Sequence, residues 1–303
     1  MLSSYGEVYA LGHRQVLTIF DDEVTIEEKI DGSQFSFGVV NGIICFRSKG
    51  AELFADSEGK CNQDMFQKAI DTVLNLFKNN PLQEGWIYFC EFLQKPKHNV
   101  LAYDRTPNKN LILFDVMIGE QNFLDYNDKS IIAGCLGLEC VPLLYKGKVS
   151  NFEELKSNME RISILGGQKI EGMVIKNYNK FTPDKKSLKG KYVSEHFKET
   201  HKKDFKVDGN KQEIIFQIIG SLRTNARWDK AIQHLKEKGE LTDSPKDIGN
   251  LMREIPLDIE KEEMDWIKEA LYKHFKKAIM GGCMKGFPEY YKELLAKSNF
   301  KNE

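Results

Sequence analysis

The chain has 303 residues and a mass of 34.9 kDa, which allows one large domain or two ordinary ones. Hydrophobic residues make up 41% and charged residues 29%, and the mean hydropathy of -0.46 is typical of a soluble globular protein rather than a disordered one. No run of about 18 apolar residues is present, and the first residues lack the pattern of a secretory signal. We therefore expect a cytoplasmic protein.

Charge and cysteine content narrow the possible partners. The 44 Lys and Arg residues balance 45 Asp and Glu residues to a formal net charge of -1, so any site for a polyanion must be a local patch. The six cysteines include no CxxC pair, and we expect them to be reduced and buried rather than bridged or bound to a metal.

The first two hundred residues read mainly as strands, because short apolar or alternating runs are separated by turn residues. Asn41-Gly42 between two such runs predicts a hairpin. Apolar residues recur every three or four positions in two segments, which predicts helices over 64–77 and 151–162. The strands are predicted over residues 24–30, 34–40, 43–47, 86–92, 111–117, 139–144 and 172–176. This part of the chain is predicted to be α+β.

The pattern becomes helical after about residue 204. Helices are predicted over residues 211–222, 226–238, 245–255, 259–280 and 287–297. This change in composition predicts a first domain over residues 1–203 and an all-helical C-terminal domain over residues 204–303, with the boundary in a polar stretch.

The first candidate for chemistry is Lys29, at the end of a predicted strand and followed by the tight turn Asp31-Gly32. Glycine lets the backbone of such a turn approach a ligand closely. A Lys-x-Asp-Gly string alone is a weak signal, since a hairpin turn with a solvated lysine would look the same. Five further segments place charged or aromatic residues at the edges of apolar strands: residues 46–49, 88–92, 111–116, 171–176 and 188–192. Together they would form a pocket for a polyphosphate and a divalent cation.

In order and approximate spacing these segments resemble the six collinear motifs of the covalent nucleotidyltransferases, which comprise polynucleotide ligases and messenger-RNA capping enzymes. The resemblance covers residues 25–195 and implies a nucleotidyltransferase domain of mainly antiparallel sheets with flanking helices. Within the superfamily, the chain is most similar to ATP-dependent RNA ligases of the RNA ligase 2 group, which seal nicks in duplex RNA.

Three features favour that group. Gln34 stands where DNA ligases usually carry arginine, and the chain becomes helical where DNA ligases and capping enzymes continue into an OB domain. Residues 191–197 resemble the group's extension of the last motif. Asp31 departs from the pattern, because some members of the group have histidine there.

The resemblance implies that Lys29 is the nucleophile, which attacks the α-phosphate of ATP and forms lysyl-AMP with loss of pyrophosphate. This step needs a neutral amine, whereas a free lysine has a pKa of about 10.4. Positive charge from Lys189, Lys191 and a bound cation is expected to lower the pKa of Lys29. Lys189 and Lys191 face the same side of their strand, because side chains two residues apart do so.

The family also implies roles at other positions. Glu171 would coordinate Mg²⁺ (or Mn²⁺), for which carboxylate and phosphate oxygens are suitable ligands. Three positions would contact the nucleoside: Glu91 would orient the ribose, Phe114 would stack on the adenine, and Glu28 would lie beside the purine through its backbone. Arg47 would bind a phosphate or the acceptor end. Asp31 would fix the turn or contact nucleic acid. A structural salt bridge is the alternative for each glutamate, and core packing is the alternative for Phe114.

The partner implied is RNA with 3'-hydroxyl and 5'-phosphate ends, in the form of a nicked duplex, acted on by a monomer without a membrane partner. AMP would pass from Lys29 to the 5'-phosphate, and the 3'-hydroxyl would then displace it. Basic residues accumulate over residues 180–206, which predicts a phosphate-binding surface, although a solvated charged linker would have the same composition.

Three other functions are alternatives to an ATP-dependent RNA ligase. A DNA ligase or capping guanylyltransferase is disfavoured by Gln34 and by the helical C-terminal region. A catalytically inert nucleic-acid-binding protein on the same scaffold is disfavoured because every charged motif residue is present. A kinase or NTPase of the P-loop type is excluded, since no GxxxxGK[ST] segment occurs.

Overall fold

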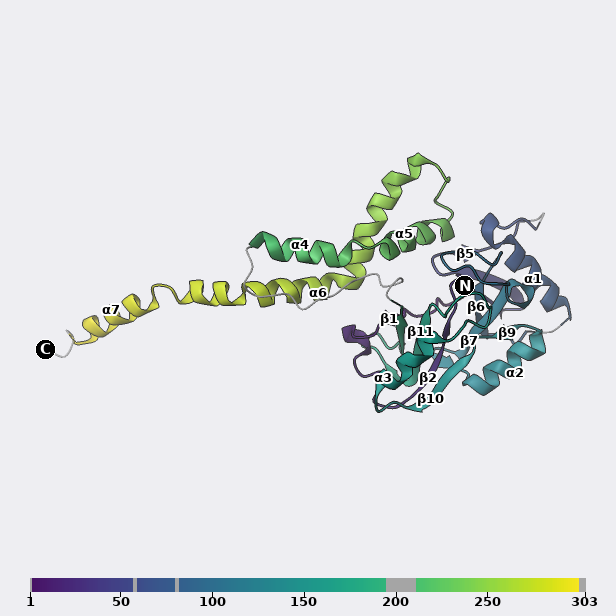
Figure 1. The fold of residues 1–303 in the computed structure, drawn as a ribbon, viewed down its shortest axis with the longest axis horizontal. Coiled ribbons are helices and arrows are strands. Elements are labelled where there is room, and N and C mark those ends of the chain that lie inside the picture. Colours follow the sequence, from purple (N-terminus) through teal and green to yellow (C-terminus); the bar gives the residue numbers. More distant parts are fainter. Residues whose placement is uncertain (1, 57–58, 80–81, 195–210, 300–303) are drawn as a thin grey trace. The chain divides into compact units, whose positions relative to one another are not determined.

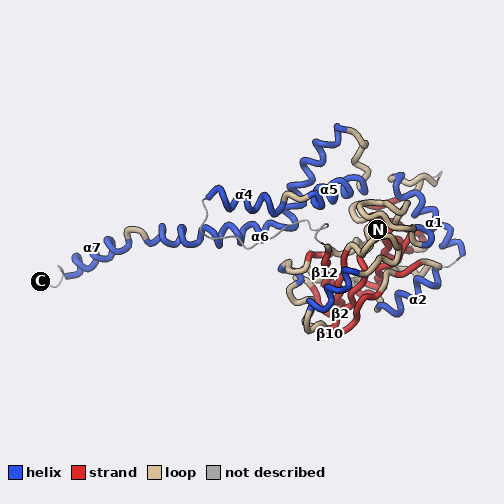
Figure 2. The backbone as a smooth tube through the Cα atoms, viewed as in Figure 1, coloured by secondary structure: helices blue, strands red, loops and turns tan. Residues whose placement is uncertain are grey.

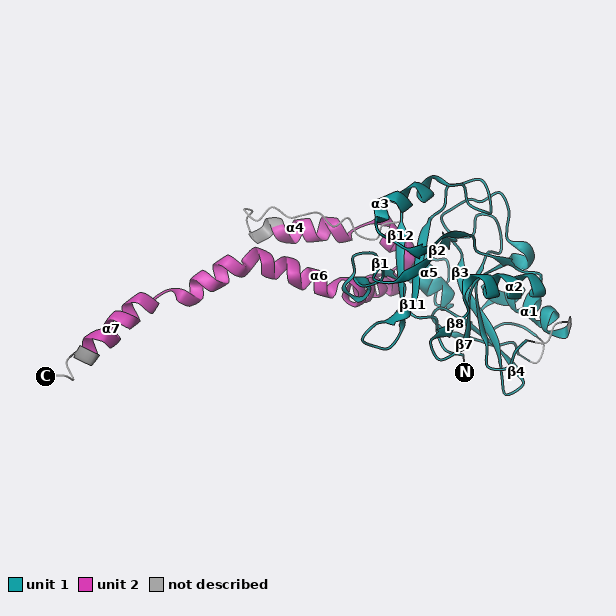
Figure 3. Cartoon of the chain, turned by 90° about the horizontal axis from the view of Figure 1, so that it is seen from below, with its two compact units in different colours: residues 1–198, 232–247 teal, residues 199–231, 248–303 magenta. Residues whose placement is uncertain are grey.

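The computed structural model describes residues 2–56, 59–79, 82–194 and 211–299. The chain divides into two compact units (Figure 3): unit 1 comprises Met1–Lys198 and Ile232–Asp247, and unit 2 comprises Glu199–Ala231 and Ile248–Glu303. The boundary predicted between residues 203 and 204 lies outside the described residues. Helix α5 (Asn225–Glu237) is shared, because its last residues from Ile232 onward belong to unit 1.

A five-stranded sheet carries the strand that ends at Lys29 (Figure 1). Its order is β1 (Tyr9–Ala10), β12 (Ser187–Val193), β11 (Gly172–Phe181), β2 (Glu23–Lys29) and β10 (Leu143–Lys148). All neighbours are antiparallel except β1 and β12.

A second, seven-stranded sheet follows the order β5 (Glu52–Leu53), β4 (Ile43–Ser48), β3 (Ser33–Val40), β6 (Ile87–Phe92), β7 (Leu111–Gly119) and β8 (Asn122–Phe123), with β9 (Glu139–Cys140) parallel to β7. The predicted hairpin is confirmed: Asn41 and Gly42 join β3 to β4 with φ angles of 53° and 73°. Two positive φ angles are typical of a two-residue hairpin turn, and Asn and Gly tolerate them best.

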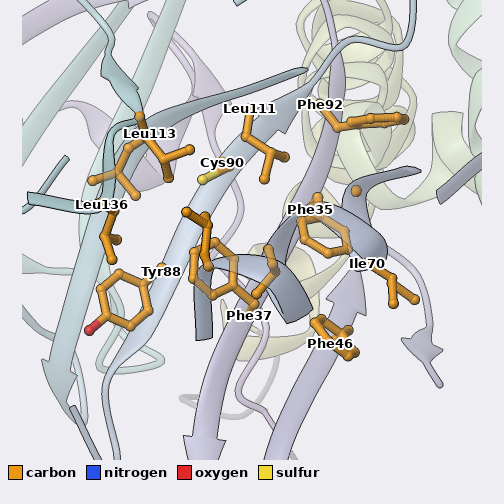
Figure 4. Close-up of a cluster of buried hydrophobic side chains, with 14 of the residues drawn as sticks. Phe35, Phe37, Phe46, Ile70, Tyr88, Cys90, Phe92, Leu111, Leu113 and Leu136 are labelled. Atoms are coloured by element: carbon orange, nitrogen blue, oxygen red, sulfur yellow. The ribbon is translucent and has the colours of Figure 1, made fainter. Parts of the chain in front are cut away.

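Helices α1 (Gln67–Asn79) and α2 (Tyr126–Leu136) contribute to the main core with the seven-stranded sheet (Figure 4). The core is rich in aromatic residues from alternate strand positions, including Phe35, Phe37, Tyr88 and Phe92. A smaller cluster lies on the five-stranded sheet and includes Leu155 of the short helix α3 (Phe152–Leu155). The α+β prediction with mainly antiparallel sheets and flanking helices is confirmed.

Several elements differ from the sequence-based expectation. The strand predicted over 139–144 is two strands, β9 in the seven-stranded sheet and β10 in the five-stranded sheet. The helix predicted over 151–162 is α3 followed by a 3-10 helix at Lys156–Glu160. Helix α2 was not predicted, although Asp125 caps its first turn by accepting from the amide of Asp128, and Gly137 ends it with a φ of 63°. In unit 2, the helices predicted over 245–255 and 259–280 form the single helix α6 (Ile248–Met284), which contains Pro256.

Unit 2 contains only helices in its described residues (Figure 2). Apolar residues of α4 (Lys211–Leu222) pack against α6, and α7 (Phe287–Asn299) follows it. These contacts bury Ile214, Ile218 and Leu222 against residues that include Trp266 and Phe275. This packing explains why α6 continues past Pro256: tertiary contacts outweigh the one hydrogen bond that proline cannot donate.

Two further expectations concern the whole chain. Among the described residues, no helix combines the length and the apolar character that crossing a membrane requires. All six cysteines are free, as expected, but only Cys61 and Cys90 are buried. Cys45 and Cys140 are half-buried, and Cys135 and Cys283 are exposed.

Candidate active site

Lys29 lies where the chain crosses from one sheet to the other. It is the last residue of β2 in the five-stranded sheet, and Ser33 begins β3 in the seven-stranded sheet. Gly32 in the connecting turn has no room for a side chain: a Cβ atom there would lie 2.8 Å from Leu93 Cδ1, 3.0 Å from the Phe92 carbonyl oxygen and 3.1 Å from Glu91 Oε2. The glycine therefore lets the turn pack directly on the end of β6, beside Glu91.

The loop that follows β6 holds this turn. The carboxylate of Asp31 accepts hydrogen bonds from the amides of Val100 and Leu101, at 2.8 and 2.7 Å, and the Asp31 amide donates to Tyr103 Oη at 2.9 Å. Asp31 thus fixes the turn, which was one of its two expected roles.

Lys29 forms an ion pair with Glu171, the residue that precedes β11. Its Nζ atom lies 2.7 Å from Glu171 Oε2, and its side chain is 28% exposed. Burial lowers the pKa of Lys29, but the carboxylates of Glu171, Glu91 and Asp31 outweigh it and raise the pKa well above its usual value. The direction is opposite to the one expected from nearby lysines, because carboxylates are the dominant charges around Nζ.

Glu91 is the second carboxylate of the site. Its Oε2 atom is buried and has no hydrogen-bond partner among the described residues. The pKa of Glu91 is raised to about 8, chiefly by burial and also by the nearby Glu237 and Glu171, against the lowering effect of Lys29. The site therefore holds a buried carboxyl group whose pKa is raised and one of whose oxygens packs against Gly32.

The two lysines of β12 have different surroundings. The positive charge of Lys191 lowers the pKa of Glu171, although burial of Glu171 is the larger effect and raises it. Lys189 donates to Ser187 Oγ at 2.7 Å, and its Nζ atom lies 4.4 and 4.2 Å from the ring centroids of Tyr5 and Phe123. Burial lowers the pKa of Lys189 to about 8. Lys189 is thus the lysine with the depressed pKa, and the structure places it among aromatic rings.

Three other predicted residues lie on β7, β4 and β2: Phe114, Arg47 and Glu28. Phe114 on β7 is half-buried and contacts Tyr5 edge-on, with 5.0 Å between ring centroids. Arg47 on β4 is half-buried, and its Nε atom has no partner among the described residues. The Glu28 carboxylate is used inside the protein, since it accepts from Ser163 Oγ and from the amide of Ile164.

A buried network under Phe114 was missed by sequence reasoning. Lys129 of α2 and Lys176 of β11 bind the Glu27 carboxylate at 2.5 and 2.7 Å, and both donate to the Phe114 carbonyl oxygen. Lys176 also lies 3.4 Å from Asp115, which accepts from the hydroxyls of Tyr5 and Tyr178. Charged residues inside apolar strands, as at positions 115 and 176, were the available signal.

The arrangement suits a nucleoside triphosphate with a divalent cation. Lys29 and Lys191 supply positive charge near Glu171, and Glu91 is a second carboxyl group within electrostatic reach of Lys29. The described residues contain no group of three or more His, Cys, Asp or Glu that would hold a metal ion by themselves. Mg²⁺ is usually bound by one or two carboxylates together with substrate phosphates, so the residues present fit such an ion.

Comparisons with known proteins give the family. The family model described as RNA ligase matches residues 22–193, which is more than half of the chain and includes Lys29, Glu91, Glu171 and Lys191. The comparison with curated proteins finds no match.

Among solved structures, the Naegleria gruberi RNA ligase with PPi aligns with a TM-score of 0.46 and 15% identity, over 64% of this chain and 56% of that chain. A mutant of the same ligase with ATP and Mn gives a TM-score of 0.46 and 14% identity, over 63% of this chain and 56% of that chain. An Aquifex aeolicus protein provisionally assigned as an ATP-dependent DNA ligase aligns with a TM-score of 0.43 and 17% identity, over 96% of this chain and 68% of that chain. The chain spans just over half of the length of the Naegleria chains. On the extent of the family-model match, this chain belongs to the RNA ligase family.

Proposed function

We propose that the protein is an ATP-dependent RNA ligase that joins 3'-hydroxyl and 5'-phosphate ends through lysyl-AMP and RNA-adenylate intermediates, and that it seals nicks in duplex RNA. The observation that carries the proposal is the position of Lys29: a partly exposed amine at the crossing of two sheets, 2.7 Å from a carboxylate that suits a divalent cation. Membership of the RNA ligase family supports the reaction class.

The first step requires Lys29 to lose its proton before it attacks the α-phosphate. The Glu171 carboxylate opposes that loss, since it raises the pKa of Lys29. A Mg²⁺ or Mn²⁺ ion bound to Glu171 would supply positive charge that offsets this effect and neutralises phosphate oxygens. Lys191, close enough to influence Glu171, would bind the same phosphates.

Other residues would bind the nucleoside. Phe114 offers a half-buried ring whose backbone is fixed by Lys129 and Lys176, and adenine would stack on it. The Glu91 carboxyl group would orient the ribose, and Arg47 would bind a phosphate. Lys189 is 1% exposed and lies against the rings of Tyr5 and Phe123, so it would act on the bound nucleotide through its charge rather than by direct contact.

The later steps are phosphoryl-centred substitutions that need positioning more than new chemistry. The 5'-phosphate attacks the lysyl-AMP phosphorus and displaces the Lys29 amine, which gives RNA-adenylate. The 3'-hydroxyl then attacks the 5'-phosphate, forms the phosphodiester and releases AMP. We propose that a cytoplasmic monomer carries out all three steps.

Intact-mass analysis after incubation with ATP and Mg²⁺ tests the proposal. We expect a mass gain of one adenylate on the wild type and none on Lys29→Ala. No gain on the wild type, or an equal gain on the variant, would contradict it. Nicked duplex RNA, nicked duplex DNA and GTP in place of ATP then separate an RNA ligase from a DNA ligase and from a capping guanylyltransferase.

A further inference from the structure

Two side chains from a distant part of the chain reach the turn that follows Lys29. Gln233 and Glu237 lie on the end of α5 that belongs to unit 1. Gln233 Nε2 donates to the Gly32 carbonyl oxygen at 3.0 Å and to Glu237 Oε1 at 2.9 Å, so both amide protons are used. Glu237 is 2% exposed and accepts a hydrogen bond from the Ser33 side chain.

The same turn is held from its other side by the loop after β6. Asn99 Nδ2 donates to the Gly32 carbonyl oxygen at 2.8 Å, so this oxygen accepts two side-chain amides, its full capacity. His98 Nε2 lies 3.1 Å from Ser33 Oγ, and its Nδ1 atom accepts from the Gln94 amide. Residues 32 and 33 are therefore enclosed by hydrogen bonds from both segments.

Ser33, His98 and Glu237 have the residue types of a hydrolytic triad, but their hydrogen bonds exclude that role. Burial lowers the pKa of His98 to about 4, so the ring is neutral at physiological pH. Because Nδ1 accepts from a backbone amide, the single ring proton is on Nε2 and is donated to Ser33 Oγ. His98 cannot take the serine proton, and that proton is directed to Glu237.

The buried carboxylate at position 237 carries an electrostatic cost. Burial raises the pKa of Glu237, which reflects the cost of its charge, and Glu237 in turn raises the pKa of Glu91. An apolar residue would avoid both effects but would leave the Ser33 hydroxyl and one Gln233 N–H group without their acceptor. The carboxylate is needed as a hydrogen-bond acceptor for Ser33, at the turn that places Lys29.

We propose that Gln233 and Glu237 are positioning residues for the reaction of Lys29 with ATP. This inference rests on the proposed function. The two side chains act through Gly32 and Ser33, three and four residues after the nucleophile, and keep the turn packed on the end of β6. Small displacements of a reacting group cost large factors in rate, so removing either hydrogen bond should slow adenylation.

The test is the single-turnover rate of AMP transfer from labelled ATP to the full-length chain, with the KM for ATP measured in parallel. We expect E237A and Q233A each to lower the rate constant roughly 10-fold or more and to change the KM by less than about 2-fold. E237Q should restore most of the rate, since its amide oxygen still accepts from Ser33. E240A removes an exposed carboxylate three residues away and serves as the matched control, with the wild-type rate expected.

Amide hydrogen exchange of residues 30–33 provides a second readout, and exchange should be faster in E237A and Q233A than in the wild type and E240A. If E237A does not fold, Q233A tests the inference on its own, because Gln233 is only half-buried. Wild-type rates in both alanine variants, or equal losses in E237A and E237Q, would overturn the inference and leave the proposed function intact. Absence of any adduct on the wild type would overturn the proposed function and the inference with it.

Discussion

Gly32 is the residue in the site with the least tolerance for change. Leu93 Cδ1, the Phe92 carbonyl oxygen and Glu91 Oε2 all lie within 3.1 Å of the place where a Cβ atom would stand, and a backbone oxygen cannot move aside cheaply. We expect Gly32→Ala to lower the rate of adduct formation at least roughly 10-fold and to cost about 1 to 3 kcal/mol of stability.

The matched control for this substitution is Gly134→Ala. Gly134 lies on an exposed face of α2, and a Cβ atom there would have no neighbour within 4 Å. Alanine has a higher helix propensity than glycine, so the free energy of unfolding of this variant should rise by about 0.5 to 1 kcal/mol and its activity should be unchanged. Equal activity of the two variants would show that the turn does not need its close approach to β6.

Glu91 gives a prediction about pH and stability. Its folded pKa of about 8 lies above the unfolded value of 4.5, so the folded state retains a proton that the unfolded state loses as the pH rises between these values. The contribution of Glu91 to the free energy of unfolding therefore falls as the pH rises from 4.5 to about 8. Glu91→Gln cannot ionise, so it escapes this loss. The difference in free energy of unfolding between the variant and the wild type should therefore grow by about 1 to 3 kcal/mol from pH 4.5 to pH 8.5, in favour of the variant.

Urea denaturation at the two pH values measures this difference. Glu23→Gln, at an exposed carboxylate at the start of β2, controls for the general effect of removing a negative charge. A difference for Glu91→Gln that does not grow with pH would mean that Glu91 ionises normally in the folded state.

The structure brings three predicted site residues together, but the expected lowering of the pKa of Lys29 is wrong. Lys29, Glu91 and Glu171 are far apart in the chain, and the structure places them within electrostatic reach of one another. The pKa of Lys29 could not be predicted, because it depends on which carboxylates lie across the two sheets. Gln233 and Glu237 carry no local signal, since they lie in an ordinary amphipathic helical pattern.

At the scale of elements, Lys129 is the residue that ties α2 to the strands beneath the site. It is 1% exposed, binds Glu27 at 2.5 Å and donates to the Phe114 carbonyl oxygen of β7. Removing one partner of a buried ion pair leaves the other charge poorly compensated. We expect Lys129→Met to lower the free energy of unfolding by roughly 3 to 5 kcal/mol, measured by urea denaturation.

Lys169→Met is the control for that experiment. Lys169 pairs with Glu160 at the surface, where both side chains are more than half exposed, and surface ion pairs contribute little to stability. If the two variants were destabilised equally, the buried network would have no special role in fixing β7 and Phe114.

The elements themselves were predicted unevenly, for identifiable reasons. Long alternating strands such as β3 and the Asn41-Gly42 turn have strong local signals, and the structure contains both. Helix α2 has a weak apolar pattern, so only Asp125 and Gly137 at its ends mark it in the sequence. Pro256 predicts the end of a helix, but packing between α4 and α6 keeps the helix continuous.

At the scale of the whole molecule, a net charge of -1 requires that an RNA-binding surface be local. Part of the basic stretch predicted for this role, residues 195–206, lies outside the described residues. The described part includes the turn between β11 and β12, where Lys185 and Lys186 are exposed. This turn lies at the end of β11 opposite Glu171 and three residues before Lys189, whose pKa is lowered mainly by burial and also by the positive charge of Lys186.

If the proposed function is correct, Lys185 and Lys186 should contribute to binding through counterion release. The double variant K185Q/K186Q should lower the magnitude of the slope of log K against log salt concentration for nicked duplex RNA by about 1 to 2, roughly one unit for each phosphate that a lysine no longer neutralises. Fluorescence anisotropy over a series of salt concentrations measures the slope. K68Q/K78Q makes the same charge change at exposed positions of α1 and should leave the slope unchanged. An equal change in both double variants would indicate that net charge, rather than this turn, governs RNA affinity.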